Sequence, residues 1–103
     1  MRFGLEENTI HKINSVFKQY ENIEKVIIYG SRAKGNFKPG SDIDLTIKSK
    51  TFTLTELLEA ENQLDDLLLP YKIDLSLFYQ ISNDDLIDHI KRVGIVFYNS
   101  SIK

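Results

Sequence analysis

Two aspartates stand two residues apart, at Asp42 and Asp44, in an alternating stretch that is typical of a β-strand. Residues two apart in a strand share a face and lie roughly 6.5 Å apart along the chain, so the two carboxylates converge on one volume. Carboxylate oxygens suit Mg²⁺ or Mn²⁺, and a pair of such ions about 3.5–4 Å apart is the usual arrangement for in-line attack on a phosphate. The pair therefore indicates metal-assisted chemistry on a phosphate.

A third aspartate, Asp74, occupies the corresponding polar position of a later predicted strand. If the two strands pair in the right register, at a separation of ~4.8 Å, all three carboxylates share one site. Asp74 could then ligate one ion and accept the proton of an acceptor hydroxyl.

A polar segment upstream offers groups that bind phosphate. Gly30 lets the backbone approach a phosphate closely, and Ser31 brings a hydroxyl and the N–H groups of a helix start. Arg32, Lys34 and Lys38 add positive charge for a leaving pyrophosphate, and Arg32 suits this best because its fork engages phosphate oxygens in pairs.

The elements that must position these residues can be read from the hydrophobic pattern. They are a helix over 5–20, a strand over 25–29, one possible helical turn from Ser31, a strand over 42–47, a helix over 54–68, a strand over 73–78, a helix from Ser82-Asn83 to Gly94, and a strand over 95–98. The predicted fold class is α/β (α+β), with one small mixed β-sheet and helices packed on one face. We expect a single domain over residues 1–103.

The composition excludes some kinds of chemistry and argues against some kinds of ligand. There is no cysteine, which rules out disulfides and thiolate chemistry and permits a cytoplasmic location. We expect no signal peptide and no membrane span. Thirteen Lys and Arg against 15 Asp and Glu give a charge of −2, so the balance does not support nucleic acid as a direct ligand.

The pattern formed by Gly30-Ser31, ten intervening residues, Asp42-Ile43-Asp44 and a separate Asp74 resembles the nucleotidyltransferase superfamily of DNA polymerase beta type. The pattern looks most like the motif of the minimal nucleotidyltransferase (MNT) branch, which includes the MntA-like antitoxins. The segments that carry this likeness are Gly-Ser-Arg-Ala-Lys-Gly and Gly-Ser-Asp-Ile-Asp-Leu. The likeness covers almost the whole chain and implies the nucleotidyltransferase fold.

The resemblance also implies an activity. Asp42, Asp44 and Asp74 would bind two Mg²⁺ ions, and Gly30 and Ser31 would bind the triphosphate of ATP; we add Arg32 and Ser41 to the expected nucleotide site. The chemistry implied is transfer of AMP from ATP to a hydroxyl, with release of pyrophosphate. The implied partner is a helical HEPN-type chain, either a toxin modified on a tyrosine or a substrate-binding subunit.

Alternatives remain at this stage. The acceptor could be a small hydroxylated molecule, or the chain could be a catalytically silent module that neutralises a partner by covering it. Asp42 and Asp44 could also form the solvated face of a strand. His11 and His89 have no partner at metal spacing and are assigned structural or surface roles, and Asp84, Asp85 and Asp88 are explained by the dipole of a helix start.

Overall fold

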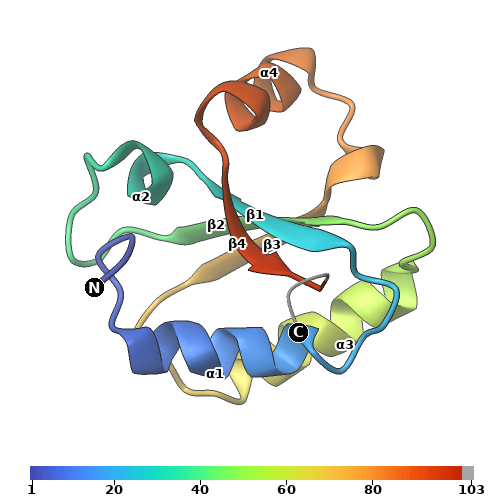
Figure 1. Ribbon diagram of the computed structural model, residues 1–103, viewed down its shortest axis with the longest axis horizontal. Coiled ribbons are helices and arrows are strands. Elements are labelled where there is room, and N and C mark those ends of the chain that lie inside the picture. Colours follow the sequence, from blue (N-terminus) through green and yellow to red (C-terminus); the bar gives the residue numbers. More distant parts are fainter. Residues whose placement is uncertain (101–103) are drawn as a thin grey trace.

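A four-stranded β-sheet in the order β3-β2-β1-β4 forms the centre of the computed structural model, which describes residues 1–100 (Figure 1). Strand β1 pairs antiparallel with β2 and with β4, whereas β2 and β3 run parallel, so the sheet is mixed as predicted. The strands are β1 (Lys25–Tyr29), β2 (Ile43–Lys48), β3 (Ile73–Leu77) and β4 (Ile95–Asn99).

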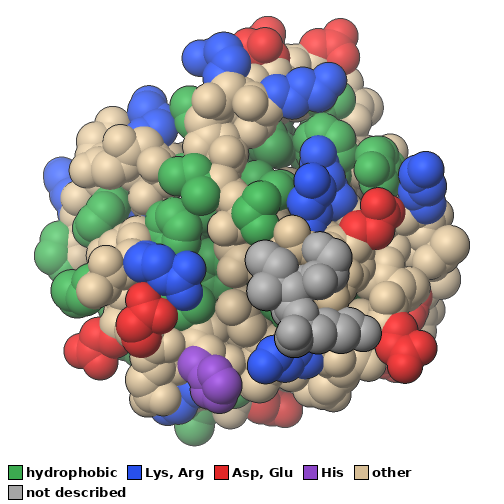
Figure 2. All heavy atoms as spheres, viewed as in Figure 1, with side chains coloured by type: hydrophobic (Ala, Val, Ile, Leu, Met, Phe, Trp, Pro, Cys, Tyr) green, Lys and Arg blue, Asp and Glu red, His purple; other side chains and the backbone are tan. Residues whose placement is uncertain are grey.

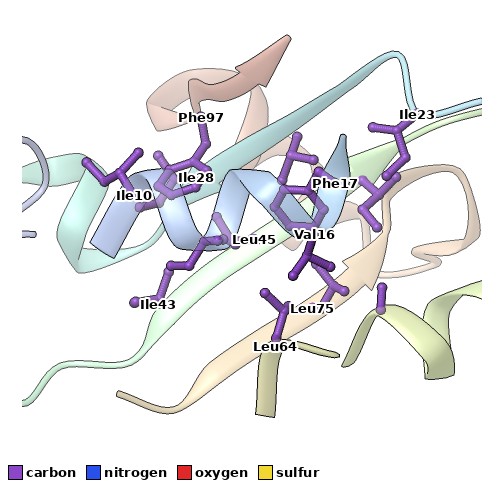
Figure 3. Close-up of a cluster of buried hydrophobic side chains, with 14 of the residues drawn as sticks. Ile10, Val16, Phe17, Ile23, Ile28, Ile43, Leu45, Leu64, Leu75 and Phe97 are labelled. Atoms are coloured by element: carbon purple, nitrogen blue, oxygen red, sulfur yellow. The ribbon is translucent and has the colours of Figure 1, made fainter. Parts of the chain in front are cut away.

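Two long helices, α1 (Glu7–Phe17) and α3 (Leu54–Asp65), lie together on one face of the sheet (Figure 1). Figure 3 shows the core that they bury, in which apolar side chains of both helices meet side chains of all four strands. The start of α3 is the predicted capping box: Thr53 Oγ1 accepts the Glu56 N–H at 3.1 Å, and Glu56 Oε1 accepts the Thr53 N–H at 2.9 Å.

The last helix, α4 (Asp84–Val93), packs on the opposite face, where Ile90 meets Ile27 and Tyr29. The expectation of helices on one face therefore holds for α1 and α3, and α4 departs from it. The reason lies in β1, whose residues 26–29 are buried without interruption. A strand that is apolar on both sides needs cover on both sides.

The remaining elements are short. The turn α2 (Ser31–Lys34) follows β1, and the 3₁₀ turn η1 (Phe78–Gln80) follows β3. Charged side chains of both signs are spread over the face seen in Figure 2, with hydrophobic side chains lying between them. None of the helices within residues 1–100 has the length and apolar character that crossing a bilayer requires.

Candidate active site

Strands β2 and β3 place two of the predicted aspartates side by side. The parallel register pairs Asp44 with Asp74, so both carboxylates stand on the same face of the sheet. Because β1 pairs Tyr29 with Asp44 across the other edge of β2, Tyr29, Asp44 and Asp74 form one row across three strands. The face is the one on which α4 lies, away from α1 and α3.

The electrostatics of Asp44 show that the carboxylates act on one another. Burial raises the pKa of Asp44, and the charges of Asp74 and then Asp42 raise it further. The positive charge of Lys72 opposes this effect and lowers the pKa. Asp42, which precedes β2 by one residue and is exposed, therefore lies near enough to belong to the same cluster.

A divalent cation fits this donor set. Within residues 1–100, no three acidic or histidine side chains approach closely enough to enclose a metal ion by themselves. Mg²⁺, however, is usually held by one or two carboxylates together with waters and substrate phosphates. The mutual repulsion around Asp44 is what such an ion would relieve.

The Gly30-Ser31 turn lies against the carboxylates because β1 ends beside Asp44. Gly30 has φ 74° and ψ −156°, a backbone conformation that is essentially restricted to glycine. A Cβ atom at this position would also collide with Asp44 Oδ2. Only glycine can therefore bring the chain from β1 into α2 at this distance from the aspartates.

Arg32 differs from its predicted role as a phosphate ligand. Its side chain is 2% exposed, and its guanidinium donates to the carbonyl oxygens of Phe3, Pro39 and Ser41 at 2.9–3.1 Å. The guanidinium also lies over the rings of Phe37 and Tyr71, 5.2 and 4.9 Å from their centroids. These donors are occupied, so Arg32 organises the segment before β2 instead of reaching a phosphate.

The other predicted polar residues lie at the surface of this segment or close a turn in it. Ser41 Oγ accepts the Lys38 N–H at 2.8 Å, and the Ser41 N–H donates back to the Lys38 carbonyl at 2.9 Å. This turn leads directly into Asp42. The side chains of Lys34 and Lys38 are exposed.

Two residues of the site were not predicted. His89, on α4, accepts the Gly30 N–H through Nε2 at 3.2 Å, and its ring meets the edge of Tyr29 at 6.2 Å between centroids. Burial raises the pKa of the Tyr29 hydroxyl, a hydrogen bond with Ser76 opposes this, and Asp44 and Asp74 raise it again. The position of Tyr29 directly before Gly30 was the available sequence signal, whereas nothing in the sequence links His89 to Gly30.

Comparison with known proteins gives related sequences and folds. The sequence model of the family "Polymerase beta, Nucleotidyltransferase" matches residues 11–103. A curated protein of Methanocaldococcus jannaschii, described as "Putative protein adenylyltransferase MJ1217", is 35% identical over 75 residues, which cover 72% of this chain and 76% of the relative.

Solved structures show the same fold. A chain of a toxin-antitoxin crystal structure with AMP-PNP has a TM-score of 0.70 at 20% identity, covering 93% of this chain and 75% of the other. One chain in the structure of the complex between tri-AMPylated Shewanella oneidensis HEPN toxin and MNT antitoxin has a TM-score of 0.68 at 14% identity. The match covers 94% of this chain and 75% of the other.

Proposed function

The chain belongs to the polymerase beta nucleotidyltransferase family, and from this premise we propose that it transfers AMP from ATP to a hydroxyl group of a protein partner. The observation that carries the proposal is the register of Asp44 with Asp74, which sets two carboxylates beside the Gly30-Ser31 turn. A nucleotidyl transfer site needs this combination, because it must hold a triphosphate and the cations that accompany it.

Asp42, Asp44 and Asp74 would hold divalent cations, with Mg²⁺ as the best fit and Mn²⁺ as a substitute. When bound, such ions neutralise phosphate charge and lower the pKa of an acceptor hydroxyl. Gly30 and Ser31 bind the triphosphate, and the turn closed by Ser41 leads directly into Asp42.

The transfer itself is a substitution at the α-phosphorus. The acceptor oxygen forms a bond to that phosphorus, the bond to the β-phosphate oxygen breaks, and pyrophosphate leaves. Asp74 accepts the proton of the acceptor hydroxyl, which its exposed carboxylate can meet at the surface. The products are the adenylylated acceptor and pyrophosphate.

The acceptor is a tyrosine of a HEPN-type helical chain, and the pair works as toxin and antitoxin. The support is the name of the curated relative, which describes a protein adenylyltransferase, and the structural likeness to complexes of a HEPN toxin with an MNT antitoxin. The exposure of Asp42 and Asp74 is also consistent with an acceptor that is itself a protein, since a partner surface can reach both carboxylates.

The test is transfer of radiolabelled AMP from ATP in the presence of Mg²⁺ and a HEPN-type chain encoded beside this one. We expect label on a tyrosine of that chain and one pyrophosphate per AMP transferred. Label only in a low-mass product would replace the protein acceptor with a small hydroxylated molecule.

A double variant, Asp42→Asn with Asp44→Asn, serves as the control for catalysis. It should bind the partner but transfer no AMP and release no pyrophosphate. If the double variant neutralises a toxic partner as well as the unmodified chain does, neutralisation works by covering the partner, and the enzymatic explanation of antitoxin action fails.

A further inference from the structure

Helix α4 reaches the Gly30-Ser31 turn through the side chain of His89. The helix lies over the end of β1, with Ile90 3% exposed against Ile27 and Tyr29. This anchor leaves the neighbouring His89 half-buried at the end of the strand, where its Nε2 accepts the Gly30 N–H at 3.2 Å. An imidazole that accepts through Nε2 is neutral, with its proton on Nδ1.

Gly30 is tied down on both sides of its α-carbon. Its N–H donates to His89, and its carbonyl accepts the Lys34 N–H at 3.1 Å. The conformation between these two bonds, with φ 74° and ψ −156°, is one that glycine adopts freely, and the two hydrogen bonds select it from the other conformations open to glycine. Asp44 closes the remaining side, since its Oδ2 lies where a Cβ of residue 30 would stand.

The direction of Ser31 follows from these anchors. The backbone of Gly30 leads directly into Ser31, so a change in the φ or ψ of Gly30 would turn the Ser31 N–H and hydroxyl away from their present positions. The ring of His89 is itself held by its edge contact with Tyr29. The hydrogen bond to Gly30 is thus a fixed part of the turn.

We propose that His89 is a positioning residue of the nucleotide site, which sets the Gly30-Ser31 turn in the geometry that receives the triphosphate. The proposal rests on the binding of ATP proposed above. The group responsible is His89 Nε2, which accepts the hydrogen bond from the Gly30 N–H. His89 does not touch the reacting atoms. It acts through Gly30, and α4 is thereby coupled to nucleotide affinity.

Two substitutions distinguish the hydrogen bond accepted by His89 Nε2 from the packing of the His89 ring on Tyr29. His89→Phe keeps an aromatic ring against Tyr29 but has no hydrogen-bond acceptor, whereas His89→Gln loses the ring but has an amide oxygen that can accept the Gly30 N–H. His11→Phe is the matched control, because His11 is exposed on α1, on the other side of the sheet.

The first measurement is hydrogen exchange of the Gly30 amide in the protein without nucleotide. In His89→Phe we expect exchange to be faster by roughly tenfold, the effect of losing one intramolecular hydrogen bond. His89→Gln and His11→Phe should stay near the unmodified rate. This measurement needs no enzymatic activity, so it tests the anchor even if the proposed function is wrong.

The second measurement is the steady-state kinetics of AMP transfer. His89→Phe should raise KM for ATP by about fivefold to tenfold, while kcat changes by less than about twofold. The reason is that the turn binds the triphosphate equally well in the ground state and in the transition state. His89→Gln should restore most of the affinity. A lost fold would lower the active fraction and hence the apparent kcat at unchanged KM.

Opposite results would overturn the proposal. If His89→Phe retains both Gly30 protection and KM while His89→Gln loses them, ring packing is what matters. If both variants keep unmodified KM, the anchor has no bearing on the nucleotide. Failure of the unmodified chain to use ATP with any acceptor would instead remove the proposed function, whatever the exchange data show.

Discussion

At the scale of single residues, the site is a cluster of like charges beside a glycine whose backbone conformation other residues rarely adopt. Asp44 is the centre of the cluster, since burial, Asp74 and Asp42 all raise its pKa. An arrangement of this kind weakens the folded state and is retained where it binds something. The residue-scale predictions therefore concern charge.

Replacing Asp44 with asparagine should separate function from stability. Because the pKa of Asp44 is raised in the folded state, its ionised form destabilises the protein above that pKa, and the effect disappears as pH falls through it. At pH 8, Asp44→Asn should melt at the same temperature as the unmodified protein or higher. AMP transfer should fall about 100-fold or more, because the ion's charge stabilisation is worth several kcal/mol.

Thermal melts at pH 8 and pyrophosphate release would check both parts. Glu21→Gln is the control, since Glu21 is exposed between α1 and β1 and should leave melting and transfer unchanged. A large loss of stability in Asp44→Asn would mean that the carboxylate has a structural partner.

Mg²⁺ should stabilise the folded protein, and more at pH 8 than at pH 5. Binding to the folded state alone adds about 2.7 kcal/mol at a concentration 100 times Kd. Protons compete for Asp44 at higher pH than for an ordinary aspartate, because its pKa is raised, so acidification removes the effect. Melting temperature measured with Mg²⁺ and with a chelator would show the difference, which should vanish in the double variant of Asp42 and Asp44.

At the scale of elements, the segment that joins α2 to β2 is held by a buried cation and not by a regular structure. Arg32 donates to the carbonyl oxygens of Pro39 and Ser41, near the end of this segment, and to that of Phe3. Its guanidinium also lies over the rings of Phe37 and Tyr71. The segment ends in the turn between Lys38 and Ser41, which lies directly before Asp42. Its order is therefore a condition for the site.

Arg32→Lys should cost about 3 kcal/mol of unfolding free energy or more, because an ammonium cannot satisfy the same carbonyls and remains buried. Urea denaturation would measure this, with Lys34→Gln as a control expected to change it by less than about 0.5 kcal/mol. Unchanged stability combined with a raised KM for ATP would return Arg32 to the role of phosphate ligand.

At the scale of the whole molecule, the two faces of the sheet have different tasks. Helices α1 and α3 build the main core on one face, and α4 covers part of the other, next to the carboxylates (Figure 1). Packing lost on either face should lower stability. Only packing lost under α4 should also disturb the nucleotide site.

Ile90→Ala and Leu64→Ala test this division, since the two side chains are 3% and 4% exposed on opposite faces. Each truncation should cost about 2–5 kcal/mol. At a temperature where both variants are folded by circular dichroism, Ile90→Ala should show a raised KM for ATP and Leu64→Ala an unchanged one. Equal kinetic effects in the two variants would contradict the division of the faces.

The sequence by itself determined the helices and strands, and it identified the residues at the centre of the candidate site. Alternation, capping and hydrophobic spacing are local properties, so β1 was predicted with its observed ends, and α3 with its observed start. The phase of alternation then put Asp44 and Asp74 on polar faces. The spacing of Gly30-Ser31 from Asp42 and Asp44 indicated the family, which the sequence match over residues 11–103 confirms.

Tertiary structure alone decided how these parts meet. Pairing register between β2 and β3 joins residues 30 positions apart, and the position of α4 joins His89 to Gly30 across 59. The burial of Arg32 likewise depends on residue 3 and Tyr71, which no local pattern connects. Long-range contacts are set by which surfaces can be buried together, and that is a property of the whole fold.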